Sequence, residues 1–186
     1  MVSEYVEYVY RHPPRCIVGL CPRPAQRPKP TAFLSPKSSV FRTCGDEADT
    51  AFFVIGCPCA HRALILLAHR AFTGPNGEDE GLTGPLAVRC AGCGTTSGLF
   101  DTRQHGYDGE QGCNTYAVGA GEPVRFRCPR CAGEEFFLCA GFSYSEPGEL
   151  AESWPGRAQD FFEGFHLLGQ CRRCSELAEI ASFECA

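Results

Sequence analysis

The chain has 186 residues, 44% of them hydrophobic, and a formal net charge of −5. This length and apolar content are typical of one or two small globular domains, and they exclude a chain that is disordered throughout. Fourteen cysteines are more than packing requires, so they indicate either disulfide bonds in an oxidising compartment or metal sites in a reducing one.

The amino-terminal sequence favours the second cause. It has no basic stretch followed by an apolar segment, so we do not expect a secretory signal. No uncharged apolar run of about 18 residues predicts a membrane span. We therefore expect a cytoplasmic protein without a membrane segment, whose closely spaced cysteines bind metal.

Residues 1–50 are expected to form a proline-rich, irregular arm or linker. Seven of the fourteen prolines fall within residues 11–36, and proline is excluded from helix interiors and central strands. His12, Cys16 and Cys21 could supply half of a third metal site. No second cysteine pair lies near them in the sequence, so a linker is the simpler interpretation.

From residue 51 onward, short apolar runs alternate with turns rich in glycine and proline, which is typical of a mostly β fold. Phe136, Leu138 and Ala140 recur with a period of two, as on one face of a strand. We predict strands over residues 51–56, 63–72, 85–89, 122–127, 135–144 and 165–170 and a loop over 73–85. Residues 157–165 could form a short helix or a strand, and a helical turn is the favoured interpretation.

Four close cysteine pairs punctuate these strands. They are Cys57 and Cys59, Cys90 and Cys93, Cys128 and Cys131, and Cys171 and Cys174. A Cys-x-x-Cys turn lets two sulfurs approach one ion at about 2.3 Å, while the backbone N–H groups between them face the thiolates. The alternative, a redox dithiol, requires a helix directly after the pair, and no helical pattern follows these pairs.

The pairs also occur in a repeated order, which predicts a duplicated unit. The first and third each contain a proline and lie between two apolar strands, and the second and fourth each follow the next strand. This order predicts that Cys57, Cys59, Cys90 and Cys93 share one ion. A second ion would then be shared by Cys128, Cys131, Cys171 and Cys174.

The arrangement resembles zinc ribbons, in which two cysteine knuckles on neighbouring β-hairpins hold one zinc ion. The resemblance covers residues 51–186 and implies tandem zinc ribbons, one over residues 51–118 and one over residues 119–186. It implies two structural zinc ions per chain, although tetrahedral sulfur also suits iron. Four sulfurs leave no position for water, so these sites are not expected to be catalytic.

Charge and motifs then order the possible functions. Residues 51–186 carry ten arginines and seventeen acidic residues, giving −7, and they contain no catalytic signature. The leading hypothesis is therefore a zinc-stabilised, non-catalytic adaptor that binds a protein partner. A cluster of arginines keeps nucleic-acid binding as an alternative. The cluster comprises Arg125, Arg127, Arg130, Arg172 and Arg173.

A third hypothesis is a hydrolase-like enzyme built on residues 100–112. Asp101, His105, Asp108 and Glu110 lie within ten residues, and a histidine beside carboxylates can serve as an acid–base pair or bind a cation. The same residues alternate with glycines, so a polar turn explains them more simply. Enzymatic activity is therefore the less favoured function.

Overall fold

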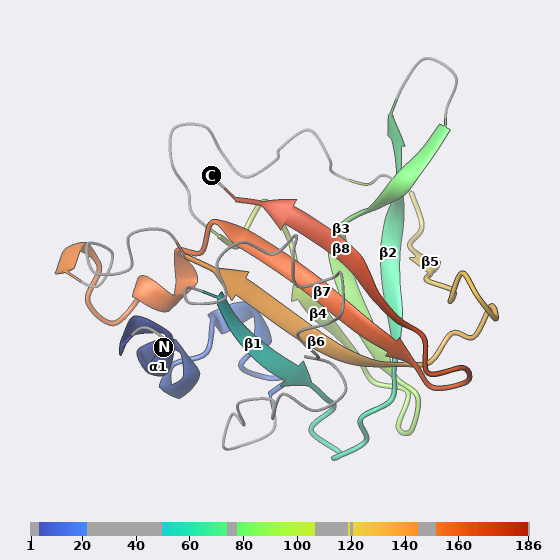
Figure 1. Cartoon of the computed structure of the whole chain (residues 1–186), viewed down its shortest axis with the longest axis horizontal. Helices are drawn as coiled ribbons and strands as arrows, with labels where there is room; N and C mark the ends of the chain where they lie inside the picture. The colour runs from blue at the N-terminus through green and yellow to red at the C-terminus, as the bar shows by residue number, and fades with distance from the viewer. Residues whose placement is uncertain are drawn as a thin grey trace.

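The computed structural model describes residues 4–21, 50–73, 78–106, 119, 121–144 and 152–185 (Figure 1). Its strands form one antiparallel sheet, and this confirms the predicted mostly β fold. None of the helices within the described ranges is long and apolar enough to cross a membrane. The strands are β1 (Thr50–Ile55), β2 (Leu64–Thr73), β3 (Glu78–Cys90), β4 (Thr96–Phe100), β5 (Val124–Arg125), β6 (Phe136–Ser143), β7 (Gly164–Cys171) and β8 (Leu177–Glu184).

The sheet consists of two similar halves. The main path runs β4-β3-β2-β6-β7-β8, so each half supplies three neighbouring strands in antiparallel order. The halves meet where Leu64 of β2 pairs with Phe136 of β6. Each of these residues lies five positions after the second cysteine of its knuckle, so the junction joins equivalent positions of the repeat.

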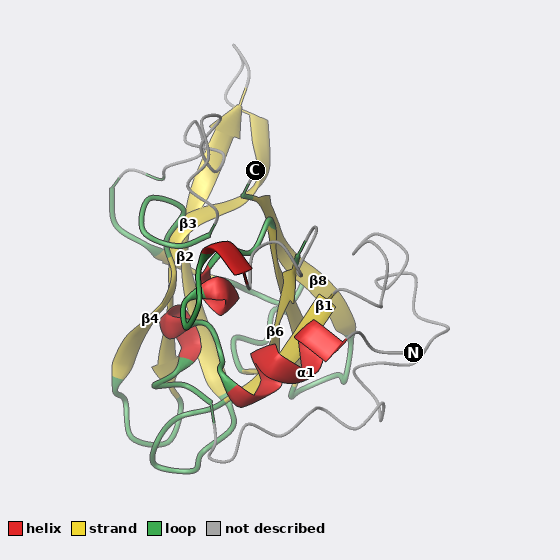
Figure 2. Ribbon diagram, turned by 90° about the vertical axis from the view of Figure 1, so that its left-hand side faces the viewer, coloured by secondary structure: helices red, strands yellow, loops and turns green. Residues whose placement is uncertain are grey.

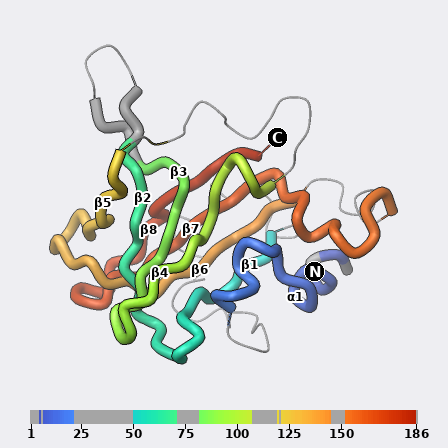
Figure 3. Tube along the Cα trace, turned by 180° about the vertical axis from the view of Figure 1, so that it is seen from behind, coloured from blue at the N-terminus to red at the C-terminus, as the bar shows by residue number. Residues whose placement is uncertain are grey.

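The first strand of each half pairs with the other half. β1 runs antiparallel to β6, from Ile55 opposite Leu138 to Thr50 opposite Ser143 (Figure 1). β5 runs antiparallel to β2, where Arg125 lies opposite Leu67 (Figure 3). The two halves therefore exchange strands within one sheet. The boundary between residues 118 and 119 stays a prediction.

Aromatic side chains fill the concave side of the curled sheet. Phe100 of β4 stacks on Phe165 of β7 with ring centroids 4.1 Å apart, although β4 and β7 are not neighbours in the sheet. Phe183 of β8 also stacks on Phe100, with centroids 5.4 Å apart. Phe142 and Phe162 complete this cluster at 4.8 Å from one another. Burial of these rings is the main apolar driving force for closing the sheet.

Residues 4–21 are part of this core, so the expectation of an extended arm is wrong for them. The helix α1 (Glu4–Arg11) lies beside β1 and buries Tyr5 and Val9, which share a face because they are four residues apart (Figure 2). A 3₁₀ turn, η1 (Arg15–Ile17), follows and contacts β4. Pro13 and Pro14 lie just beyond α1, where they end the helix instead of preventing it, and the other five prolines of the predicted arm lie outside the described residues.

Six of the strands were predicted at these places, although β5 covers only two of the six residues expected, and β4 and β8 were not predicted. Residues 78–84, expected as loop, belong to β3, and Leu82 lies opposite Arg70 in the pairing with β2. Two register shifts interrupt this hairpin, which lets the glycine-rich sequence continue as a strand. The expected helical turn within 157–165 is the 3₁₀ turn η4 (Ala158–Asp160), which precedes β7.

Candidate metal centres

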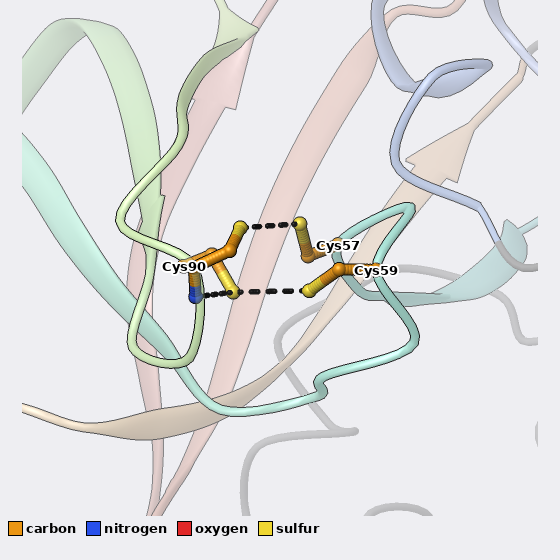
Figure 4. Close-up of side chains that lie close together, drawn as sticks. Cys57, Cys59 and Cys90 are labelled. Carbon is orange, nitrogen blue, oxygen red and sulfur yellow. Dashed lines mark hydrogen bonds between the residues drawn. The ribbon is translucent and has the colours of Figure 1, made fainter.

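The eight paired cysteines lie in two groups of four, with the sulfurs of each group within 4.8 Å of one another. In the first group the Cys57 and Cys93 sulfurs are 3.5 Å apart, and those of Cys59 and Cys90 are 3.6 Å apart. Figure 4 shows that the side chains of Cys57 and Cys59 point from one loop toward Cys90 on the opposite loop. Two knuckles distant in sequence therefore face each other.

The second group repeats this geometry. The sulfurs of Cys128 and Cys174 are 3.6 Å apart, and those of Cys131 and Cys171 are 3.5 Å apart. A tetrahedral ion bound to sulfur at about 2.3 Å separates its ligands by about 3.8 Å, whereas a disulfide holds two sulfurs about 2.05 Å apart. Both groups thus have the spacing of a four-sulfur metal site, and either could hold a metal ion.

The backbone of each knuckle turns sharply, in the same way in both halves. The residue after the second cysteine has a positive φ at Ala60 (67°) and Ala132 (57°). Because side chains disfavour this left-handed conformation, its recurrence at equivalent positions is a feature of the knuckle itself. The second knuckles turn likewise at Gly94 (φ 76°) and Ser175 (φ 59°).

Hydrogen bonds hold the knuckles on the sheet at equivalent places. In the first half, the Ala91 N–H donates to the Ala63 carbonyl at 3.1 Å, joining the second knuckle to β2. In the second half, the Arg172 N–H donates to the Glu135 carbonyl at 3.0 Å. Strand pairing therefore brings both quartets together before any ion is considered.

Polar groups around the Cys93 sulfur favour its thiolate form. The Cys93 N–H donates to the Cys90 sulfur at 3.4 Å, and the Thr95 hydroxyl lies 3.3 Å from the Cys93 sulfur. Hydrogen bonds from the Thr95 side chain and backbone lower the pKa of Cys93 to about 6. Because thiolate is the metal-binding form of cysteine, these contacts prepare the site for a cation.

The two quartets differ in exposure. Cys59 and Cys93 of the first quartet are exposed, whereas no cysteine of the second quartet is. The first knuckle carries His61 two residues after Cys59, and its ring lies against Gly92, where an added Cβ would come within 2.8 Å of the His61 Cγ. His61 thus covers the opposite knuckle, and it is not part of either ligand group.

Arginines surround the second quartet and are held by acidic residues. Arg130 pairs with Glu176 at 2.8 Å. Arg172 pairs with Glu135, also at 2.8 Å. Arg173 donates to the Cys131 carbonyl at 3.2 Å. These contacts join the two knuckles across the site, as outer residues commonly do around metals.

The remaining arginines of the cluster share one acidic partner. Arg125 pairs with Glu134 at 2.9 Å, and Arg127 pairs with the same carboxylate group at 3.0 Å. Four of the five arginines therefore pair with three glutamates and Arg173 with a carbonyl, so the cluster keeps +2 before the charge of the thiolates is counted. Sequence reasoning found the arginines but missed their partners, which the alternation of charges near each knuckle could have indicated.

The candidate catalytic loop is a hydrogen-bonded turn where the structure describes it. The Asp101 carboxylate accepts from the Arg103 N–H (3.0 Å) and the Gln104 side chain (2.8 Å). The His105 Nδ1 accepts from the Asp101 N–H at 3.0 Å, and burial lowers the pKa of His105, which favours this neutral form. Asp108 and Glu110 lie outside the described residues.

The suggested third half-site does not assemble. No third group of metal-ligating side chains occurs within the described ranges. Cys16 and Cys21 lie against the core, and burial raises the pKa of each thiol to about 12. Because they pack against the core outside both four-cysteine groups, these two cysteines act as small apolar side chains.

Comparisons with protein families, with curated proteins and with solved structures found no match.

Proposed function

We propose that this protein is a zinc-stabilised adaptor that binds a protein partner without catalysing a reaction. The proposal rests on the two four-cysteine groups, which lie on a sheet in which the first strand of each half pairs with the other half. In each group, two sulfurs come from the loop after β1 or β5, and two come from the β3–β4 or β7–β8 turn. An ion in the first group would link the loop after β1, a strand that pairs with the second half, to the β3–β4 turn of the first half. An ion in the second group would link the loop after β5, a strand that pairs with the first half, to the β7–β8 turn of the second half.

Zinc is the proposed metal in both groups. Four thiolates saturate its tetrahedral shell, so the ion has no open position for water or substrate and supports folding only. A structural zinc site contributes on the order of 10–16 kcal/mol of folding free energy. Iron in the same shell remains the alternative, and it would reveal itself by colour and redox activity.

The charge pattern supports a protein partner over nucleic acid. Phosphate binding requires arginines and lysines that can neutralise phosphates, and the arginine cluster here is largely engaged by Glu134, Glu135 and Glu176. The chain as a whole carries −5, which repels a polyanion. Three large apolar side chains are exposed among the described residues, and one of them is a tryptophan, a residue type enriched at interface hot spots. They are Val18, Val124 and Trp154.

Two measurements test the proposal. Elemental analysis of the purified chain should give two zinc ions per molecule, and a content below one would contradict the structural part. Photo-crosslinking from p-benzoylphenylalanine at positions 18, 124 and 154, in cells of the source organism, should then capture a protein from at least one position. The same probe at the exposed Arg103 is the control. Zinc without any crosslink above that control would overturn the adaptor role.

A further inference from the structure

We propose that the groove beside β5 binds an extended, acidic segment of a protein partner, which adds to the sheet as a strand. The inference rests on the proposed adaptor function and specifies its binding surface. It starts from the internal symmetry of the fold, because β1 and β5 occupy equivalent places in the two halves. One of them is covered by the chain itself.

The outer edge of β1 is covered by the amino-terminal segment. The Phe52 N–H donates to the Tyr10 hydroxyl at 3.1 Å, and the Gly56 N–H donates to the Leu20 carbonyl at 2.8 Å. The Tyr10 ring also packs on Phe53, with centroids 5.3 Å apart. Residues 4–21 thus accept hydrogen bonds from the Phe52 and Gly56 N–H groups along the edge of β1 that faces away from β6.

The equivalent edge of β5 has no such cover among the described residues. The Phe126 N–H donates to the Leu66 carbonyl of β2, so the N–H groups of Arg125 and Arg127 face the other way. No backbone hydrogen bond reaches the Arg127 N–H within the part of the chain that the structure describes. Arg127 lies one residue before its knuckle, as Gly56 does in the first half.

A groove of about 700 Å³ lies along this edge. Its lining combines apolar side chains, including the exposed Val124 (36% accessible), with arginines whose side chains reach solvent. The lining residues are Arg70, Leu82, Val124, Arg125, Phe126, Arg127 and Glu134. An open strand edge beside an apolar and charged groove is the setting in which proteins accept an added strand.

Charge complementarity identifies the occupant. Arg125 and Arg127 share the single carboxylate of Glu134, so this part of the groove lining keeps a charge of +1 on a chain that carries −5 in total. A segment that alternates acidic and apolar residues would place carboxylates near the arginines and apolar side chains near Val124 and Leu82. A nucleic acid fits less well, because it has no peptide N–H and C=O groups to pair with the open edge of β5.

The test uses the complete zinc-loaded protein and a fluorescein-labelled, capped nonapeptide in which glutamate and valine alternate. Fluorescence anisotropy should show saturable binding that weakens as salt rises, because exposed charges are screened. Two control peptides have lysine in place of glutamate or N-methyl groups on alternate amides. Each should bind at least about tenfold more weakly, because the first reverses the charge and the second blocks strand pairing.

The protein variants are matched in charge. Arg125→Glu combined with Arg127→Glu should reduce peptide binding at least about tenfold. Arg62→Glu combined with Arg103→Glu makes the same charge change at exposed positions outside the groove and should leave binding within about twofold. Both variants are checked for two bound zinc ions. If the groove variant fails to fold, the N-methylated peptide still decides the question on the unaltered protein.

Several outcomes would contradict peptide binding in this groove and leave the proposed adaptor function unaffected. If the N-methylated peptide bound as tightly as the unmodified one, binding by strand addition would be excluded. Labelled RNA that displaces the glutamate peptide would make the groove a nucleic-acid site. Concentration-dependent dimerisation abolished by the Arg125→Glu and Arg127→Glu pair would make the occupant a second copy of this chain. Peptide binding only after residues 107–118 are replaced by a Gly-Ser linker would make it this chain's own segment. Crosslinks from positions 18 or 154 but none from 124 would move the partner to another face.

Discussion

Two pairs of residues at equivalent positions differ in size between the two repeated halves. In the first half, position 61 is histidine and position 92 is glycine, and the ring occupies the space above the glycine. At the equivalent positions of the second half, 133 is glycine and 173 is arginine. A Cβ on Gly133 would come within 3.3 Å of the Arg173 Cβ and within 3.2 Å of the Cys171 sulfur. Large and small residues have therefore exchanged places between the halves.

Gly92→Ala should destabilise the protein, because the new Cβ would come within 2.8 Å of the His61 Cγ. Overpacking of this kind costs about 1–3 kcal/mol, which chemical denaturation of the zinc-loaded protein can measure. Gly98→Ala is the control, since its Cβ would meet no atom within 4 Å, and no loss is expected there. His61→Ala in the Gly92→Ala background should cost less than the sum of the single changes. Additive losses would contradict the contact.

The sequence predicts the cysteine quartets well because their spacing is local. Two sulfurs separated by one or two residues share a turn, and the repeated order indicates which turns belong together. The supporting contacts were not predictable in the same way. Arg130 and Glu176 are separated by 45 intervening residues, and only the strand pairing brings their side chains to 2.8 Å. The grouping of ligands is visible in the sequence, while their surroundings depend on the sheet.

At the level of elements, the amino-terminal segment replaces a missing strand neighbour. Residues 4–21 cover the outer edge of β1 and reach across to β4, and they add Ile17 and Leu20 to the core. Proline content directed the prediction toward a linker. The spacing of Tyr5 and Val9 was the overlooked signal, because residues four apart share a helix face.

Val9→Ala should lower the free energy of unfolding, because Val9 is fully buried at 0% accessibility. Loss of two buried carbon atoms costs about 1.5 kcal/mol at roughly 0.8 kcal/mol per methylene. Val18→Ala is the matched control, since that side chain is 42% accessible, and its effect should be within about 0.5 kcal/mol. Equal effects in thermal or urea denaturation would mean that α1 is not part of the cooperative fold.

Most strands were predictable from alternation and turn residues, but their partners were not. The run from Phe136 to Phe142 alternates as a strand whichever neighbour it has. Its pairing with β1 instead of β5 depends on contacts between residues more than 80 positions apart, such as Phe53 opposite Ala140. A local pattern fixes which face of a strand is buried, and it leaves the choice between equivalent neighbours open.

At the scale of the whole molecule, two unequal four-cysteine groups lie on one sheet. The first site has two exposed cysteines and the second has none, so attack by a chelator should be easier at the first. In the second, ion pairs of Arg130 and Arg172 also join the knuckles across the sulfurs. The two groups thus have the same four cysteines but differ in how far solvent can reach the sulfurs.

Zinc release to a chromogenic chelator should therefore occur in two phases of equal amplitude, the faster one from the first site. Cys59→Ser should remove the fast phase, and Cys131→Ser, its positional counterpart in the second half, should remove the slow one. Circular dichroism during release reports whether the sheet survives the first loss. A single phase releasing both ions, or the opposite assignment by the two variants, would contradict the difference in protection.

The crossed placement of β1 and β5 also bears on how the chain can be divided. A polypeptide that ends after β4 keeps β1 without its partner β6, and one that begins before β5 keeps that strand without β2. Each fragment is thus incomplete alone and complementary to the other, as subunits of an intertwined dimer are. In the intact protein the peptide linkage raises their effective concentration. Co-expressed fragments would reassemble into the same intertwined body, with one four-sulfur site built on each.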